Sequence, residues 1–99
     1  MAKRHRVLVS DKISQRALET LKKNNIDFDY KPDCGTSDSL KDVIEPYSGL
    51  IIRSASKVSR DVIDRGKNLQ VIGRAGIGVD NIDLKAASSK GIVVMNTPH

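Results

Sequence analysis

Residues 69–83 read LQVIGRAGIGVDNID, and this stretch decides what kind of fold the chain forms. An apolar run of the kind that forms buried strands comes first, and it leads into a turn that contains Gly73, Gly76 and Gly78. Glycine tolerates positive φ and lets other groups approach the backbone, so the chain either bends sharply here or binds something. Arg74 lies inside this turn. Its guanidinium, beside unshielded amides, suits a carboxylate or phosphate, although a tight turn with a solvated arginine fits this stretch equally well.

A second apolar run ends in the same way. Residues 49–57 read GLIIRSASK, so that Arg53 follows a short buried strand and is itself followed by small hydroxyl residues. Two arginines at the ends of successive parallel strands would lie at the same edge of one sheet. In open α/β sheets this carboxyl edge is where ligands bind, and the pair therefore favours an anion site over a bare turn.

The remaining sequence alternates strands with helices. We expect strands at 6–10, 26–30, 49–53, 69–73 and 92–95, and helices at about 14–24, 37–46, 59–66 and 83–90. Ser14, Ser37, Ser59 and Asp83 are the expected N-caps, and Gly66 is expected to end its helix in a left-handed conformation. This alternation predicts an α/β fold with a doubly wound, parallel five-stranded sheet of flavodoxin-like order 2-1-3-4-5. The strictly alternating strand at 26–30 suits an edge.

Composition narrows the possible partners. Ninety-nine residues allow one domain, and 17 Lys and Arg against 12 Asp and Glu give a net charge of +5, which suits an anionic ligand. The basic residues are dispersed and the only aromatic residues are Phe28, Tyr30 and Tyr47, so we expect no nucleic-acid partner. The longest apolar run, 92–95, is far too short to cross a membrane. A single cysteine, Cys34, favours a reducing compartment, and we expect the cytoplasm.

Several chemistries lack their residues in this stretch. The glycine cluster has Asn81 where a dinucleotide fingerprint needs its third glycine, and the first strand-to-helix turn, residues 10–13, has none. We therefore expect no cofactor site, no metal site and no catalytic triad here. A phosphoacceptor domain would need an aspartate where Arg53 stands, and a flavin carrier would need a hydroxyl-rich loop after the first strand. An isolated anion-binding or interaction module without catalytic activity remains the alternative to part of an enzyme.

Three blocks together resemble one family. IIRSASKV at 51–58, VIGRAGIGVDNID at 71–83 and GIVVMNTP at 91–98 are similar, in sequence and in spacing, to the D-2-hydroxyacid dehydrogenases. The resemblance implies that residues 1–99 form a single domain, the N-terminal segment of the substrate-binding lobe, and that the nucleotide-binding domain lies outside them. It also implies NAD as the cofactor of the parent protein, though not of this stretch alone. A small anionic hydroxyacid is the implied substrate, with 3-phosphoglycerate as the expected one.

The resemblance also assigns roles to single residues. Arg53 and Ser54 would hold anionic groups of the substrate, Arg74 would add positive charge, and the backbone amides of Ala75 and Gly76 would meet its carboxylate. Asn96 would either face the cleft or shape a turn, whereas Gly78 and Asp80 suit a structural role. No catalytic residue is expected here, because neither His5 nor His99 matches the family's catalytic histidine. The truncated lobe alone is therefore expected to be inactive.

The fifth predicted strand is apolar on both faces. Ile92 and Val94 alternate with Val93 and Met95, and the short helix before this strand can cover only one of the two sides. An uncovered apolar strip beside an unpaired strand edge promotes association. The sequence therefore predicts that the chain self-associates through this strand.

Overall fold

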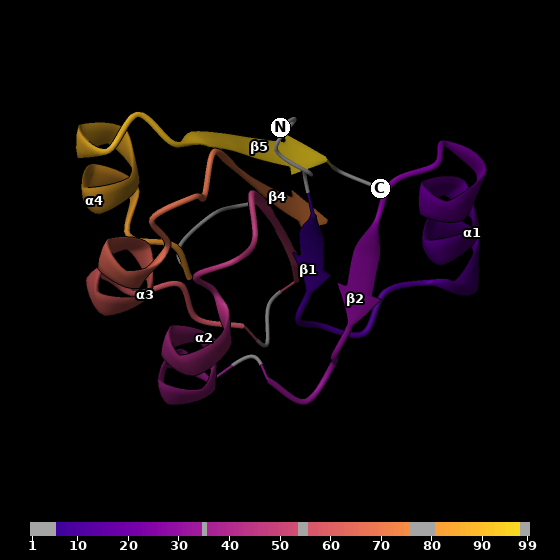
Figure 1. The fold of residues 1–99 in the computed structure, drawn as a ribbon, viewed down its shortest axis with the longest axis horizontal. Coiled ribbons are helices and arrows are strands. Elements are labelled where there is room, and N and C mark those ends of the chain that lie inside the picture. The colour runs from indigo at the N-terminus through magenta and orange to yellow at the C-terminus, as the bar shows by residue number, and fades with distance from the viewer. Residues whose placement is uncertain (1–5, 35, 54–55, 76–80, 98–99) are drawn as a thin grey trace.

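The computed structural model describes residues 6–34, 36–53, 56–75 and 81–97, with the side chains of residues 37, 75, 96 and 97 excepted. Strands and helices alternate along the chain (Figure 1). Their bounds are β1 Val7–Val9, α1 Gln15–Lys23, β2 Phe28–Tyr30, α2 Ser37–Val43, β3 Gly49–Ile52, α3 Arg60–Arg65, β4 Val71–Ala75, α4 Leu84–Ser89 and β5 Val93–Thr97. No helix in the described ranges is long and apolar enough to span a membrane.

The sheet has the predicted topology. Its strand order is β2-β1-β3-β4-β5 and each neighbouring pair is parallel. The alternating strand β2 lies at one edge, as expected, and β5 lies at the other. This confirms the α/β class and the flavodoxin-like order, and it brings the carboxyl ends of β1, β3 and β4 next to one another.

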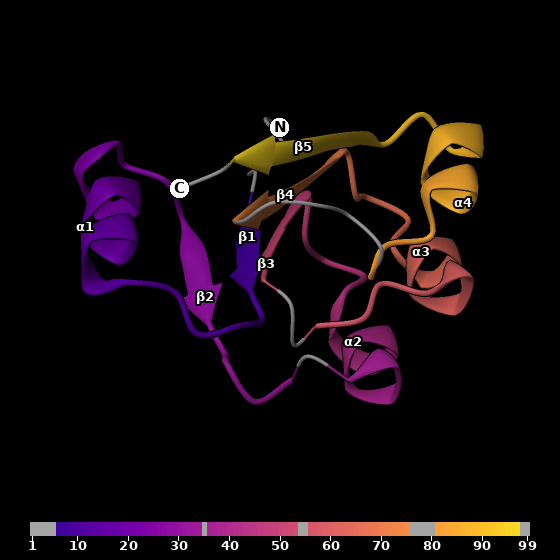
Figure 2. The ribbon, with the colours of Figure 1, turned by 180° about the vertical axis from the view of Figure 1, so that it is seen from behind.

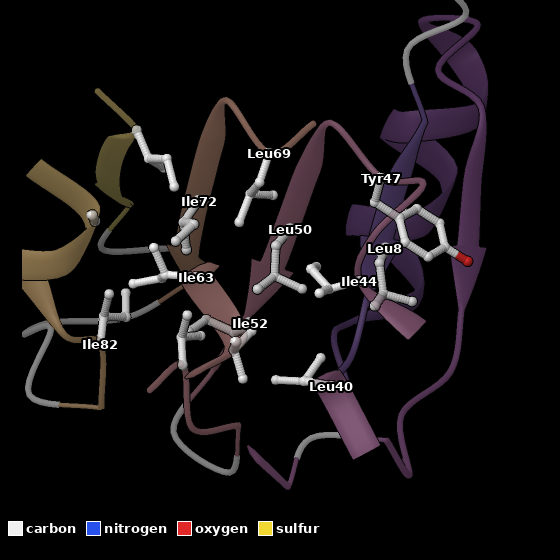
Figure 3. Close-up of a cluster of buried hydrophobic side chains, with 14 of the residues drawn as sticks. Leu8, Leu40, Ile44, Tyr47, Leu50, Ile52, Ile63, Leu69, Ile72 and Ile82 are labelled. Carbon is white, nitrogen blue, oxygen red and sulfur yellow. The ribbon is translucent and has the colours of Figure 1, made fainter. Parts of the chain in front are cut away.

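One face of the sheet carries the core. Three helices, α2, α3 and α4, gather on that side, away from α1 (Figures 1 and 2). Alternate residues of β1, β3 and β4 point toward these helices, as the period of two in a strand requires. The fully buried large side chains of this cluster, most of them drawn in Figure 3, are Leu8, Leu40, Ile44, Leu50, Ile52, Val58, Val62, Ile63 and Ile72.

The opposite face is covered at one end only. Helix α1 lies at that end, beside β2 (Figures 1 and 2), and its apolar stripe is only half-buried. Val9, Ile51, Gly73 and Met95 form one row across this face. Val9 is fully buried, whereas Met95 is 51% exposed and a Cβ added to Gly73 would meet nothing within 4 Å. The predicted uncovered strip on β5 is therefore present, and Val93, 56% exposed, continues it.

Two of the predicted helix caps are confirmed by their hydrogen bonds. The Ser14 hydroxyl accepts from the amide of Ala17 at 3.1 Å, and a carboxylate oxygen of Asp83 accepts from the amide of Ala86 at 3.0 Å. Each bond satisfies an amide that the first helical turn leaves without a partner. Ser59 also stands at the predicted N-cap position of α3, with extended backbone angles.

Two other predictions about helix ends are wrong. The cap of α2 is Thr36, not Ser37, because Thr36 has the extended backbone that lets its hydroxyl accept from Ser39. Gly66 ends α3 at φ −80°, outside the left-handed region. A different constraint acts there, since a Cβ at Gly66 would lie 3.0 Å from the Cβ of Leu69.

Two strands start two residues later than the sequence suggested. The prediction placed a strand at 26–30, but Asn25 adopts φ 58° and the amide of Ile26 bonds back to Leu21 of α1, so β2 begins at Phe28. The prediction for the fourth strand, 69–73, is two residues early. The amide of Leu69 bonds to Gly66, and β4 continues to Ala75 because it pairs with β5 up to that point.

Candidate functional site

The candidate site lies at the carboxyl edge of the sheet, where β1, β3 and β4 end. Among the described residues, the buried polar side chains are Ser10, Asp11 and Ser56, and all three lie at this edge. Buried polar groups are costly unless they are hydrogen-bonded, so such a cluster needs specific partners. Its partners prove to be the backbone that follows β3.

The Asp11 side chain binds two main-chain amides that follow β3. Its carboxylate oxygen Oδ2 accepts from the amide of Arg53 at 2.5 Å and from the amide of Ser56 at 3.0 Å. The Ser56 hydroxyl lies 2.8 Å from the Ser10 hydroxyl, and the two can exchange donor and acceptor roles. Because bonds to a charged acceptor are the stronger kind, the segment after β3 is fixed to the end of β1.

The Asn81 side chain binds the main-chain carbonyls of the same two residues. Its Nδ2 donates to the carbonyl of Arg53 at 2.8 Å and to the carbonyl of Ser56 at 2.7 Å. Its Oδ1 accepts from Nε of Arg74 at 2.8 Å. Residue 81 is itself placed by backbone pairing, since its carbonyl accepts from the amide of Val58 at 2.9 Å. One amide side chain thus connects the Arg74 guanidinium to the backbone of Arg53.

The two arginine side chains leave the edge in different directions. Arg74 is the register partner of Ile52 in β3 and of Asn96 in β5. Arg53 lies one residue beyond Ile52, and successive residues of a strand point to opposite faces. The exposed Arg53 side chain donates from Nη1 to the carbonyl of Lys12 at 3.3 Å, whereas the half-buried Arg74 turns toward Asn81. Both predicted arginines therefore lie at one edge, but on different sides of it.

The other predicted residues are described only in part. Ala75 and Asn96 lie at the ends of β4 and β5 in the register that pairs Arg74 with Asn96 and Ala75 with Thr97. Ser54 and Gly76 lie outside the described residues. So do His5, His99, Gly78 and Asp80.

Sequence reasoning missed Asp11, Ser56 and Asn81. Asp11 had been considered only as part of a turn without glycine, and Asn81 only as a mismatch to a nucleotide fingerprint. A usable signal was present, because Ser10 and Asp11 directly follow a buried strand, where a polar side chain faces the ligand edge. Their partners are main-chain atoms of a loop distant in sequence, which no residue pattern identifies.

A second polar cluster lies toward the amino end of the sheet. Arg6 donates from Nε and Nη2 to the two carboxylate oxygens of Asp29 at 2.9 and 2.6 Å, and the Tyr47 hydroxyl donates to Asp29 at 2.5 Å. The bonds from Arg6 and Tyr47 hold the pKa of Asp29 well below its usual value, and the pKa of Arg6 is raised in turn. Burial and the bond to Asp29 raise the pKa of Tyr47 to about 12. This cluster neutralises its own charge and fixes β2 to the sheet.

The turn after β1 differs from a dinucleotide-binding turn. A dinucleotide-binding turn offers free backbone amides to the pyrophosphate at the start of the next helix. Here the turn instead contains the buried carboxylate of Asp11, which would repel a pyrophosphate and already accepts two backbone amides. Within the described residues no three His, Cys, Asp or Glu side chains come together to hold a metal ion. Burial also raises the pKa of the Cys34 thiol, which disfavours a reactive thiolate.

This fold is shared by dehydrogenases that act on 2-hydroxy acids. The chain belongs to the family of D-isomer specific 2-hydroxyacid dehydrogenases, whose catalytic-domain model matches residues 7–99. Among its relatives is the D-3-phosphoglycerate dehydrogenase of Archaeoglobus fulgidus, 42% identical over 93 residues that cover 94% of this chain and 18% of the relative. The hydroxypyruvate reductase of Thermotoga maritima is 43% identical, over 96% of this chain and 31% of the relative.

A solved structure shows the same likeness. The 3-phosphoglycerate dehydrogenase of Entamoeba histolytica, crystallised with NAD⁺, superposes with a TM-score of 0.81 at 28% identity, over 93% of this chain and 32% of that one. The chain thus spans less than a third of the length of the relatives named here. These relatives are oxidoreductases, and their likeness to this chain lies within one part of their length.

Proposed function

We propose that this chain is part of the substrate-binding lobe of an NAD-dependent D-2-hydroxyacid dehydrogenase, and that its substrate is 3-phosphoglycerate. The parent protein would oxidise this substrate to 3-phosphohydroxypyruvate, the reaction that opens serine synthesis. Family membership favours this function over an anion-binding module without catalysis. A cytoplasmic location goes with it, on the grounds of the single Cys34 and the metabolic relatives.

The observation that carries the proposal is that Arg53 and Arg74 lie at one edge of the sheet, where Asn81 bonds to the Arg74 guanidinium and to the main chain of Arg53. The substrate bears a carboxylate and a phosphate, and two guanidinium groups at one edge provide a charge for each. The proposed contacts are Arg53, Ser54, Arg74, the amides of Ala75 and Gly76, and Asn96. The net charge of +5 helps to attract such an anion.

The choice of substrate rests on the phosphate. The relatives include both a phosphoglycerate dehydrogenase and a hydroxypyruvate reductase at nearly the same identity, so identity does not separate the two substrates. A protein that uses 3-phosphoglycerate gains a contact to the phosphate that D-glycerate cannot make. The two guanidinium groups favour 3-phosphoglycerate, which bears two anionic groups, over D-glycerate, which bears one.

An NMR titration with the two acids tests this proposal. We expect 3-phosphoglycerate to bind with a dissociation constant of about a millimolar, since the isolated edge is exposed and its charges are screened. The amides of Arg53, Ser54, Arg74 and Gly76 should shift first, and D-glycerate should bind more weakly. Equal affinity for both acids would argue against phosphate recognition. Shifts confined to the basic residues 3–6 would mean that the anion binds elsewhere.

We propose that the chain alone neither turns over NAD nor binds it. The carboxylate of Asp11 in the turn after β1 supports this, as does the absence of a dinucleotide fingerprint from the sequence. NAD would be held by a part of the parent protein outside these residues. NADH fluorescence in the presence of 3-phosphoglycerate should show no rate. A rate that rises with protein concentration and disappears in Arg74→Ala would overturn the proposal.

We also propose that a second copy of the chain covers the open strip on β5. Val93 and Met95 are about half exposed on an edge strand whose outer backbone groups have no neighbouring strand in the described sheet. The space over Gly73 leaves room for a side chain of the partner. Edge pairing or face packing between copies would bury the strip.

Size-exclusion chromatography with light scattering at several concentrations tests the association. Met95→Lys should shift the chain to monomer, whereas Leu84→Lys should not, although Leu84 on α4 is almost as exposed at 45%. Added salt should strengthen the association, because it screens the repulsion between two chains of charge +5. A monomer at high concentration, with β5 amides protected from exchange, would contradict it.

A further inference from the structure

Asn81 bonds both to the guanidinium of Arg74 and to the main chain of Arg53, although neither its residue type nor its position marks it as part of a site. Its amide makes three hydrogen bonds of 2.7 to 2.8 Å, two as donor and one as acceptor. The orientation of the amide follows from these partners. The two main-chain carbonyls of Arg53 and Ser56 require the NH₂ group, and Nε of Arg74 requires the oxygen.

The main chain of Arg53 and that of Ser56 are each held by the same two side chains. Asp11 accepts from the two terminal amides, and Asn81 donates to the two terminal carbonyls. Asp11 belongs to the end of β1, whereas Asn81 follows the glycine-rich stretch after β4. Residues 53 and 56 are therefore held from two neighbouring parts of the sheet edge, and the Asn81 side chain also accepts from the Arg74 guanidinium.

We infer that Asn81 is a positioning residue for the anionic substrate, because it ties the Arg74 guanidinium to the backbone that carries Arg53. The inference rests on the proposed function and extends it to a residue that does not itself carry charge. An arginine side chain loses considerable conformational freedom when it binds an anion. Asn81 restricts that freedom before the ligand arrives, and so lowers the cost of binding.

A double-mutant cycle between Asn81 and Arg74 tests this inference. The dissociation constant for 3-phosphoglycerate is measured by NMR for the wild type, Asn81→Ala, Arg74→Ala and the double variant. We expect Asn81→Ala to weaken binding about tenfold, as for the loss of a hydrogen bond to a charged group. The double variant should bind no more weakly than Arg74→Ala, because Asn81 acts through Arg74.

A matched control separates positioning from general stability. Asn68 also donates from Nδ2 to a main-chain carbonyl, that of Glu45 at 2.8 Å, but it lies between α3 and β4 at the other end of the sheet. Asn68→Ala should leave the dissociation constant unchanged. In the ligand-free wild type, the Nε–H of Arg74 should exchange slowly with solvent, and this protection should be lost in Asn81→Ala but kept in Asn68→Ala.

The outcomes distinguish this inference from the proposed function. Binding by the wild type with unchanged affinity in Asn81→Ala, or additive effects in the cycle, would overturn the positioning role and leave the proposed function intact. Absence of binding by the wild type would overturn the proposed function, and the role of Asn81 toward the substrate with it. If Asn81→Ala does not fold, Asn81→Gln keeps the amide one methylene further out. Wild-type affinity in Asn81→Gln would then count against the inference.

Discussion

The two ends of the sheet use polar side chains in opposite ways. Toward the amino end, Arg6, Asp29 and Tyr47 bond to one another, and the charge of the carboxylate is neutralised within the cluster. At the carboxyl edge, Asp11 and Asn81 bond to the main chain of another segment. A cluster that satisfies itself fixes a strand. The second cluster instead holds the main chain of residues 53 and 56 at the carboxyl edge.

The largest loss of stability is expected when Asp11 at the carboxyl edge is replaced. Asp11→Ala would leave the buried amide of Ser56 and the part-buried amide of Arg53 without their acceptor, at a cost of about 3 kcal/mol in the free energy of unfolding. Urea denaturation followed by circular dichroism measures it. Asp11→Asn keeps one acceptor oxygen and should lose less. A loss below that of any variant in the amino-end cluster would mean that the loop is not held mainly by Asp11.

The second largest effect is expected in acid, which should destabilise the cluster at the amino end of the sheet. The folded-state pKa of Asp29 lies below its ordinary value of 3.8, so its contribution to stability is complete above pH about 4 and is lost as pH falls below that. Asp29→Asn should remove this part of the pH dependence, with a loss of stability between those of Asp11→Ala and Tyr47→Phe. Unfolding free energies measured from about pH 6 downward test it.

The control for the acid experiment is Asp38→Asn. The Asp38 side chain is 94% exposed and lies 3.3 Å from Lys41, and exposed pairs of this kind contribute little. The free energy of unfolding of Asp38→Asn should therefore change with pH as that of the wild type does across the acid range. If Asp29→Asn also followed the wild type, the amino-end cluster would contribute no stability through its charge.

Tyr47 sharpens the comparison from the alkaline side. Tyr47→Phe removes one hydrogen bond to a carboxylate that keeps Arg6, and should cost about 1 kcal/mol. Because the pKa of Tyr47 is raised in the folded state, its protonated hydroxyl contributes fully to stability below pH 10. This contribution is lost as pH rises from 10 to about 12. Ultraviolet absorbance of the phenolate should show a late transition in the wild type that is absent in Tyr47→Phe. If the transition lost in Tyr47→Phe instead lay at an ordinary tyrosine pKa, the bond to Asp29 would be contradicted.

The smallest effect is expected for a charge pair that belongs to neither cluster. Asp64 of α3 lies 3.7 Å from Lys90, and both side chains are about half exposed. Asp64→Asn should change the free energy of unfolding by less than about 1 kcal/mol, because water and salt screen such a pair. A larger loss, measured by the same urea denaturation, would mean that the effects at the two sheet ends cannot be ascribed to their specific networks.

Much of the fold could be predicted from the sequence because its signals are local. The strand signals predicted at 49–53 and 69–73, the alternation at 26–30 and the caps at Ser14 and Asp83 each depend on near neighbours in the chain. The errors were local too. Thr36 replaced Ser37 as a cap, and Gly66 proved to be constrained by Leu69 and not by its φ. Neighbouring residues of similar propensity compete for such positions, and packing selects between them.

Sequence by itself determined that two arginines end successive strands of a parallel sheet, and thus that they lie at one edge. Only the tertiary structure decided how that edge is built. The carboxylate of Asp11 and the amide of Asn81 meet the main chain of residues 53 and 56 across sequence separations of 25 to 45 residues. The physical reason is that main-chain amides and carbonyls are present at nearly every residue, so the sequence cannot show which of them a distant side chain will bind.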